Sequence, residues 1–267
     1  LNVSGTHFPA VLQIAKDNIA NTFIIHFHGN ACDASQVSVS ARVEARSFNS
    51  HYMVVEYPGY GLADGTSTES LLNSIAFSTF KYVVEVLKIP PEKIVIYGRS
   101  VGSGVAVHLA SKLEGMGIPI GALILHSPYT SIRDVAKDIL GCTSLLFANR
   151  WSNWKALTHK DVNDNSVNPI GYNNNTSKSN NEEKSETDTN TNTNVNRNIN
   201  NLSEKYLNAK CLTIKSPVLF LHADRDQIID HHHSATLNLK RSHAKLKTEL
   251  FTQVSNEYFT KDHNMYD

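Results

Sequence analysis

Short apolar runs rich in β-branched residues recur along the chain and alternate with stretches that have helical spacing. The apolar runs predict strands at residues 11–14, 23–27, 52–55, 94–97, 122–125, 218–221 and 246–251. The helical stretches are 67–87, 101–113 and 134–140. Strands that alternate with helices indicate a mostly parallel sheet with helices on both faces. Ligands of such sheets bind at the carboxyl ends of the strands, so the residues directly after each run are the candidates for function.

One segment departs from this pattern. Residues 163–201 consist mainly of Asn, Ser, Thr and Glu and hold almost no large apolar side chain. Such a composition cannot offset its own ordering entropy, so we expect a disordered insert in the cap region. The alternative is that this segment is a partner-binding or regulatory loop. Its composition favours the disordered insert. The rest of 1–267 fits one α/β domain.

The most informative segment follows the run 94–97. This predicted strand leads into Gly98-Arg99-Ser100-Val101-Gly102 and then into a helix rich in small residues. That order is typical of the nucleophile elbow of an α/β-hydrolase, a tight turn that presents a serine hydroxyl to the cleft. The two glycines remove side chains that would clash in the turn. We therefore expect Ser100 to be a nucleophile, and the flanking strand and helix disfavour a chance match in a loop.

A serine nucleophile needs a base, usually His, and an acid that orients the base. In this fold the chain order is Ser, then Asp or Glu, then His. Asp224 and Asp226 both follow the run 218–221, and we expect Asp226 to be the acid because it lies deeper in the loop. Asp224 is more readily a turn former or a partner of Arg225. His263 follows the last predicted strand and is the expected base.

The oxyanion hole of such an enzyme needs two backbone N–H donors. We expect one at Val101, directly after the nucleophile, and the other at Asn30, in the His28-Gly29-Asn30 turn after the run 23–27. Alternatively, Asn30 acts through its side chain, which would stiffen the loop. Cys32 lies close to this turn, where packing is a better interpretation than a second nucleophile, because the sequence offers it no base.

The run His231-His232-His233 has the composition of a metal cluster. Neighbouring residues of a helix point in different directions, so three consecutive histidines cannot all bind one ion. We therefore expect an exposed helix start, with Asp230 as its cap. The sequence predicts no metal site and no cofactor.

Composition narrows the possible partners and compartments. The chain has 25 basic and 25 acidic residues, and this balance does not support nucleic-acid binding. No apolar run approaches the length of a membrane span, and no secretory signal is visible at Leu1. Because Leu1 is not Met, we expect a piece shortened at both ends, with any targeting segment upstream. Cys32, Cys142 and Cys211 are few and far apart, which favours a reducing compartment.

Five motifs together resemble a known family. They are His28-Gly29-Asn30-Ala31, Glu56-Tyr57-Pro58-Gly59-Tyr60-Gly61, Tyr97-Gly98-Arg99-Ser100-Val101-Gly102, His126-Ser127-Pro128-Tyr129-Thr130-Ser131 and Ser216-Pro217-Val218-Leu219. Their order is similar to that of α/β-hydrolase-domain serine hydrolases of subfamily 17, with the bud-emergence-type and subfamily 13 proteins. The resemblance covers nearly all of the chain outside the insert. It implies a triad of Ser100, Asp226 and His263, and hydrolysis of an ester or thioester.

Members of subfamily 17 are protein depalmitoylases, so the resemblance implies an acyl-protein or lipid ester as substrate. Three features depart from the family. The lipidated, cysteine-rich N-terminus is absent, so membrane association at the cytoplasmic side would depend on an upstream segment. Asp262 stands before His263 where the family commonly has Gly. We also expect the final helix of the fold to lie beyond Asp267.

Several alternatives remain open from the residues alone. A lipid or small-molecule carboxylesterase, a lysophospholipase and a peptidase all use the same constellation. A non-catalytic binding module, or a membrane-associated scaffold with activity secondary, belongs to another class of function. The binding module is disfavoured because all three triad residues are present. Apolar side chains before the insert either line an acyl pocket or form ordinary core, and they are Leu145, Leu146, Phe147, Trp151 and Trp154.

Overall fold

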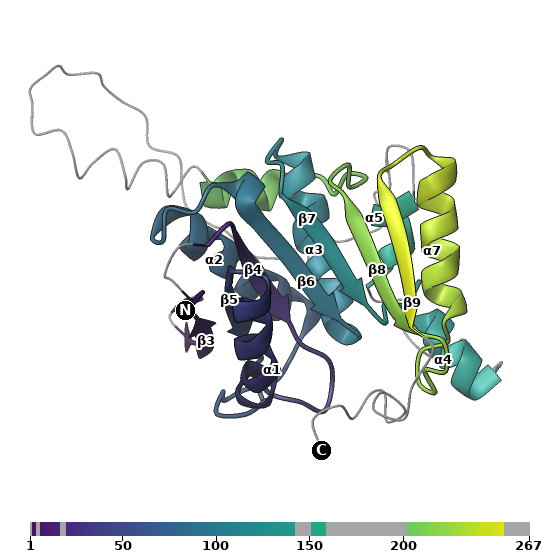
Figure 1. Ribbon diagram of the computed structural model, residues 1–267, viewed down its shortest axis with the longest axis horizontal. Coiled ribbons are helices and arrows are strands. Elements are labelled where there is room, and N and C mark those ends of the chain that lie inside the picture. Colours follow the sequence, from purple (N-terminus) through teal and green to yellow (C-terminus); the bar gives the residue numbers. More distant parts are fainter. Residues whose placement is uncertain (1, 4–5, 17–19, 142–150, 159–201, 254–267) are drawn as a thin grey trace, which may run out of the picture.

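The computed structural model describes residues 2–3, 6–16, 20–141, 151–158 and 202–253. Seven strands form one sheet in the order β3-β5-β4-β6-β7-β8-β9 (Figure 1). They are β3 (Ala10–Gln13), β4 (Thr22–Phe27), β5 (Ser50–Val55), β6 (Ile94–Arg99), β7 (Ala122–His126), β8 (Val218–Ala223) and β9 (Thr248–Gln253). Strand β3 pairs antiparallel with β5, and the other neighbours are parallel, which confirms the mostly parallel sheet. The last strand begins two residues later than the sequence predicted.

The remaining elements are helices and a small hairpin. The helices are α1 (Ala34–Ser47), α2 (Glu69–Glu85), α3 (Val101–Gly115), α4 (Ile132–Leu140), α5 (Asn153–Thr158) and α7 (His232–His243), with a 3₁₀ turn at Pro91–Lys93. The strands β1 (Asn2–Val3) and β2 (Thr6–His7) pair antiparallel with each other. Among the described helices, none has the length and apolar character to cross a membrane.

The two faces of the sheet bury different side chains. Alternate residues of β4 divide between them, because successive side chains of a strand point to opposite faces. Phe23 and Ile25 pack in the main core, which also holds apolar residues of α2 and α3. Ile24 packs in a smaller core with Val37 and Ala41 of α1. Helices therefore cover both faces, as expected, with α1 on the face opposite α2 and α3 (Figure 1).

Backbone hydrogen bonds join the carboxyl ends of three adjacent strands. The N–H of Ser100, directly after β6, donates to the carbonyl of His126 at the end of β7, at 2.9 Å. The N–H of Ser127 donates in turn to the carbonyl of Leu221 in β8, at 2.8 Å. These bonds hold the segments that follow β6, β7 and β8 at one edge of the sheet, where ligands of this fold class bind.

A buried arginine fixes the segment that leads into β8. Arg241 of α7 is fully buried, and its guanidinium donates to carbonyl oxygens at 2.9–3.4 Å. The acceptors are Leu157, Ile214, Ser216 and Lys247. Burial lowers the pKa of Arg241 to about 10, so the group remains a cation at neutral pH. Arg241 thereby ties α5, the entry to β8 and the entry to β9 to one helix.

Candidate active site

Ser100 occupies the tight turn between β6 and α3. Its backbone has φ 49° and ψ −122°, in the left-handed half of the map that non-glycine residues rarely adopt. A Cβ placed on Gly98 would lie 2.5 Å from the carbonyl oxygen of Gly102, and one on Gly102 would collide with the carbonyl of Phe27. Only glycine at both positions lets β6, α3 and the end of β4 approach this closely. The steric reason for the two glycines is therefore as the sequence predicted.

The turn after β4 lies against the serine. A Cβ on Gly29 would lie 3.4 Å from the Cβ of Ser100, so the two turns are in direct contact. Asn30 follows on the exposed side, and its side-chain oxygen accepts a short hydrogen bond from the Tyr60 hydroxyl. That bond matches the loop-stiffening role considered for the Asn30 side chain. Val101 is the first residue of α3, so its N–H has no carbonyl four residues earlier within the helix.

A buried ion pair, which sequence analysis missed, supports this turn. His28 is fully buried, with Nε2 3.1 Å from Oε1 of Glu56 and Nδ1 2.9 Å from the carbonyl oxygen of Gly29. Both ring nitrogens face acceptors, so both must carry a proton and the ring is an imidazolium. Its ring stacks on Tyr57 at 4.0 Å between centroids. The chain thus places a cation directly behind the predicted oxyanion loop.

The protonation of this pair follows from its contacts. Burial alone would lower the pKa of His28, but hydrogen bonds with the Cys32 thiol and the Glu56 carboxylate outweigh burial and raise that pKa to about 9. Burial alone would raise the pKa of Glu56, and the hydrogen bond from His28 reverses this effect and lowers it. Cys32 is buried and donates to the Gly29 carbonyl at 3.2 Å, in agreement with a packing role.

Glu56 also anchors the start of α1. Its Oε2 accepts the N–H of Ala34, the first residue of that helix, and Oε1 accepts the N–H of Tyr57, each at 3.0 Å. A carboxylate at a helix N-terminus is favoured by the helix dipole. A side chain at Gly61 would collide with Glu56. The signal in the sequence was an acidic residue directly after a buried strand, a position that this fold reserves for functional or loop-fixing groups.

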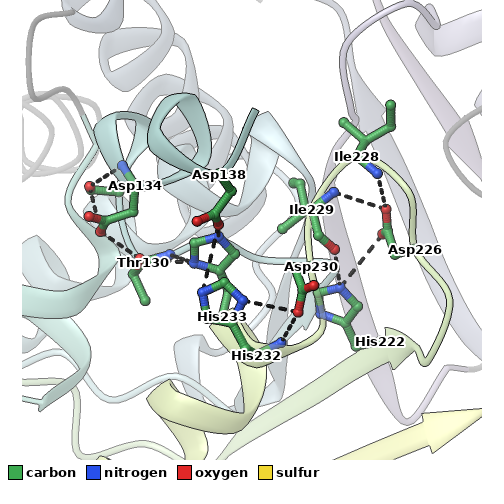
Figure 2. A network of polar contacts seen from close by, with 11 residues as sticks. Thr130, Asp134, Asp138, His222, Asp226, Ile228, Ile229, Asp230, His232 and His233 are labelled. Atoms are coloured by element: carbon green, nitrogen blue, oxygen red, sulfur yellow. Dashed lines mark hydrogen bonds and ion pairs between the residues drawn. The ribbon is translucent and has the colours of Figure 1, made fainter. Parts of the chain in front are cut away.

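Asp226 lies in the loop after β8 (Figure 2). It is buried, whereas Asp224 is exposed. Oδ1 of Asp226 accepts the N–H groups of Ile228 and Ile229, both at 3.0 Å. Oδ2 lies 3.6 Å from Nε2 of His222. The carboxylate is therefore held by its own loop at the edge of the sheet that carries Ser100. His263, the expected base, lies outside the described residues, as does the insert 163–201.

His222 is a second buried histidine that the sequence did not single out. Its Nε2 donates to the carbonyl of Ile229 at 2.8 Å, and its Nδ1 lies 2.6 Å from the Ser234 hydroxyl. Burial lowers the pKa of His222, and the Ile229 carbonyl and Asp226 oppose this only in part. The ring is neutral at pH 7 and links β8, the acid loop and α7.

The expectation of an exposed histidine run is wrong for His233. His232 is exposed and begins α7, but His233 is buried and contacts Thr130 and Asp138 (Figure 2). The first turn of α7 packs against α4, so one of two adjacent side chains is covered. The N-cap residue of α7 is His231 rather than the expected Asp230, but Oδ1 of Asp230, one residue earlier, accepts the His232 N–H at 2.8 Å.

The aromatic residues before the insert pack against the main core. Trp151 and Trp154 are half-buried there, and the N-terminal turns of α3 leave room for Trp151 only because Gly104 has no side chain. The core interpretation therefore applies to both tryptophans. Leu145, Leu146 and Phe147 lie outside the described residues.

Comparisons with known proteins agree with the fold. The family model of the serine aminopeptidase S33 hydrolases matches residues 24–255. Over 116 residues the chain is 34% identical to the lysophosphatidylserine lipase ABHD12 of Danio rerio, covering 43% of this chain and 30% of that protein. It is 33% identical to the protein bem46 of Schizosaccharomyces pombe over 116 residues, covering 43% of this chain and 38% of that protein.

A human relative belongs to the subfamily that the motifs resemble. The chain is 34% identical over 113 residues to the α/β-hydrolase domain-containing protein 17B, covering 42% of this chain and 38% of that protein. The relatives of subfamily 17 and of the bem46 type confirm the resemblance. The matched segments span only about a third of the length of these relatives.

Solved structures confirm the fold. The esterase Est1E of Butyrivibrio proteoclasticus, bound to ferulic acid, aligns with a TM-score of 0.54 at 17% identity, covering 94% of this chain and 87% of that one. A serine hydrolase homologue from Coxiella burnetii aligns with a TM-score of 0.57 at 10% identity, covering 98% and 89% of the two chains. At such identities the likeness shows the α/β-hydrolase fold alone.

Proposed function

This chain belongs to the serine aminopeptidase S33 family of α/β-hydrolases, which are serine hydrolases, and we propose that it cleaves acyl esters or thioesters. In this proposal Ser100 is the nucleophile, Asp226 the acid and His263 the base. The observation that carries it is the backbone of Ser100, held at φ 49° between β6 and α3. Strained backbone of this kind persists where the surrounding structure enforces it, as at the nucleophile of this fold.

The proposed reaction is a two-step acyl transfer. Oγ of Ser100 attacks the acyl carbon while His263 accepts the hydroxyl proton, and Asp226 orients the imidazole. The N–H groups of Val101 and Asn30 stabilise the oxyanion of the tetrahedral intermediate. The leaving thiol or alcohol departs with the proton from His263. Water, deprotonated by His263, then attacks the acyl-enzyme, releases the carboxylic acid and regenerates Ser100.

The cationic ring of His28 supports the same assignment. It lies in the turn that contacts Ser100, held there by the buried carboxylate of Glu56. It also fixes the carbonyl of Gly29, which precedes the predicted Asn30 donor. His28 and Glu56 are therefore proposed as positioning residues of the oxyanion loop.

The motifs shared with subfamily 17 favour a fatty acyl thioester on a protein as substrate. That substrate would be met at the cytoplasmic side of a membrane, with peripheral association through an upstream segment. A lysophospholipid or small carboxylic ester is the second candidate, because one relative is named a lysophosphatidylserine lipase. Both substrates present an acyl carbonyl, so the same residues act on either.

Labelling with a fluorophosphonate probe tests the nucleophile. Wild type and Ser103→Ala, a neighbouring serine of α3 that is buried, are expected to label, and Ser100→Ala is not. Equal labelling of Ser100→Ala would refute the assignment. A folded wild type that never labels would favour the non-catalytic module. With labelling established, turnover of a palmitoylated peptide thioester is compared with turnover of a lysophospholipid, and the larger kcat/KM selects between the two candidates.

A further inference from the structure

A cluster of two histidines and one carboxylate lies where α7 begins against α4 (Figure 2). The rings of His232 and His233 stack with their centroids 4.2 Å apart. Their Nε2 atoms lie 3.7 Å and 2.9 Å from the same oxygen, Oδ2 of Asp138. Two imidazole nitrogens and one carboxylate, contributed by two helices about 95 residues apart along the chain, therefore converge on one point.

The outer nitrogen of each ring has its own hydrogen-bond partner. Nδ1 of His232 lies 3.0 Å from Oδ1 of Asp230, and Nδ1 of His233 lies 2.9 Å from Oγ1 of Thr130. Metal-bound histidines characteristically donate their other ring N–H to such a partner, which fixes the tautomer and the ring orientation. His232 thus has the outer support that a metal ligand needs, and His233 has it when its Nδ1 carries the proton.

The contacts of Thr130 bear on the tautomer of His233. The Thr130 hydroxyl donates to Oδ2 of Asp134 at 2.6 Å, so its oxygen is left to accept the Nδ1–H of His233. In that state Nε2 directs a lone pair at Asp138, and a cation between them relieves the repulsion. The backbone N–H of Thr130, at 3.3 Å from Nδ1, favours the other tautomer, in which Nε2–H donates to Asp138 and no metal is needed.

We propose that Asp138, His232 and His233 form a binding site for a divalent transition metal, with zinc as the best fit. Two imidazoles and a carboxylate are donors that suit zinc. The three ligand atoms lie within 4.8 Å of one another. Zinc bonds of about 2.0–2.2 Å require ligand separations of about 3.3–3.6 Å in a tetrahedron. His232, at 3.7 Å from Asp138, is nearly in place, and the exposed Asp138 carboxylate would have to move outward from its 2.9 Å contact with His233. Water supplies the fourth ligand on the open side.

The surroundings favour a cation. Carboxylates of Asp134 and Asp230 flank the three ligands, and Lys137 faces Asp134 as a neighbouring positive charge. Asp138 lies near the C-terminal end of α4, where the helix dipole is negative.

A metal here would join α4 to the start of α7 and, through Asp230, hold the loop that carries Asp226. The site stands independently of the proposed hydrolase function, because none of its ligands is placed in the triad. Three consecutive histidines cannot all bind one ion from a helix. The structure brings only two of them to one carboxylate, because His231 precedes the helix as its N-cap residue.

Isothermal titration of the 267-residue chain with ZnCl₂ tests the proposal. Wild type is expected to bind one equivalent more than Asp138→Asn or His232→Gln, two changes at exposed positions that leave the core intact. His243→Gln, at the opposite end of α7, is the matched control and should bind as wild type does. Asp230→Asn, which changes only the hydrogen-bond partner of His232 Nδ1, should weaken the zinc affinity of this site by about 10-fold.

A readout of coordination separates a metal site from hydrogen bonding alone. With Co²⁺ in place of Zn²⁺, wild type and His243→Gln should show the intense visible absorption of four-coordinate cobalt. Asp138→Asn and His232→Gln should lose it. Equal zinc stoichiometry and affinity in wild type and the two ligand variants would overturn the proposal, as would a wild type without the extra equivalent.

Discussion

Two buried histidines lie beside carboxylates at the same edge of the sheet, yet they differ in charge. Nε2 of His28 is 3.1 Å from Glu56, and Nε2 of His222 is 3.6 Å from Asp226. Contacts raise the pKa of His28 to about 9, whereas burial lowers the pKa of His222. Both rings are removed from water, so burial alone does not explain the difference.

The partner of each ring nitrogen decides the charge. Both nitrogens of His28 face oxygens that can only accept, from Glu56 and from the Gly29 backbone, so a second proton is stabilised. Nδ1 of His222 faces the Ser234 hydroxyl, which can donate, so one proton satisfies the ring. In this protein the pKa of a buried histidine is raised where, besides the carboxylate, the other ring nitrogen meets the Gly29 carbonyl and Cys32, and is lowered where that nitrogen meets a hydroxyl.

The largest expected effect is the loss of activity on changing Asp226, the carboxylate beside His222. If Asp226 orients the catalytic base, Asp226→Asn should lower kcat by about 10⁴-fold, because the amide stabilises the wrong tautomer of the base. The amide oxygen can still accept the N–H of Ile228, so the loop should stay folded. Initial rates on an activated acyl ester, with circular dichroism of the folded state, measure this.

The matched control is Asp224→Asn, an exposed aspartate two residues earlier in the same loop. Its rate should stay within about two-fold of wild type, as surface substitutions away from a site usually do. If Asp224→Asn were the inactive variant, the acid would have to be reassigned to Asp224.

The next largest effect is the loss of stability expected on changing Glu56, the carboxylate beside His28. Glu56→Gln leaves the imidazolium of His28 buried without its counter-charge, which should cost about 3–5 kcal/mol of unfolding free energy. Urea denaturation at pH 7 measures the loss. Glu92→Gln, at an exposed position, should change stability little. A Glu56→Gln protein as stable as wild type would show that His28 is neutral.

The pH dependence of stability separates the two histidines. The pKa of His28 is raised from 6.5 to about 9, so its contribution is complete below pH 6.5 and is lost as the pH rises toward 9, by roughly 3 kcal/mol at most. The pKa of His222 is lowered, so its contribution is present above pH 6.5 and is lost as the pH falls below that value. Burial also lowers the pKa of the half-buried His108, to about 4, so its contribution to stability is likewise lost as the pH falls.

Urea titrations of wild type and Glu56→Gln at pH 6.5 and pH 9 test the predicted loss of stability at alkaline pH. Wild type should lose stability between these values, and the variant should lose much less. Parallel slopes in the two proteins would assign the alkaline loss to other groups.

The smallest effect is expected at the neutral histidine. His222→Gln removes hydrogen bonds to Ser234 and Ile229 without stranding a charge, so the cost should be about 1–3 kcal/mol. Urea denaturation, with the exposed His243→Gln as reference, measures it. A cost greater than that of Glu56→Gln would reverse the charges assigned to the two pairs.

Local sequence predicted the parts of the fold whose geometry is local. Each apolar run became a strand, and the elbow around Ser100 followed from two glycines within two residues of it. Helix α1 was missed because its buried face consists largely of small residues, such as Ala41 and Ala45, in a serine-rich stretch with weak contrast between its faces. The exposure of His233 was also misjudged, because α4 covers it from about 95 residues away along the chain.

The sequence by itself determined the fold class and the tight turn around Ser100, because strand periodicity and turn sterics depend on neighbouring residues. The triad of Ser100, Asp226 and His263 stays a proposal. Only the tertiary structure decided that Glu56 meets His28, since their strands β5 and β4 become neighbours by parallel pairing. It also decided which histidines are charged. A pKa depends on burial and on the acceptors that distant segments bring to each nitrogen, and these are properties of the packed molecule.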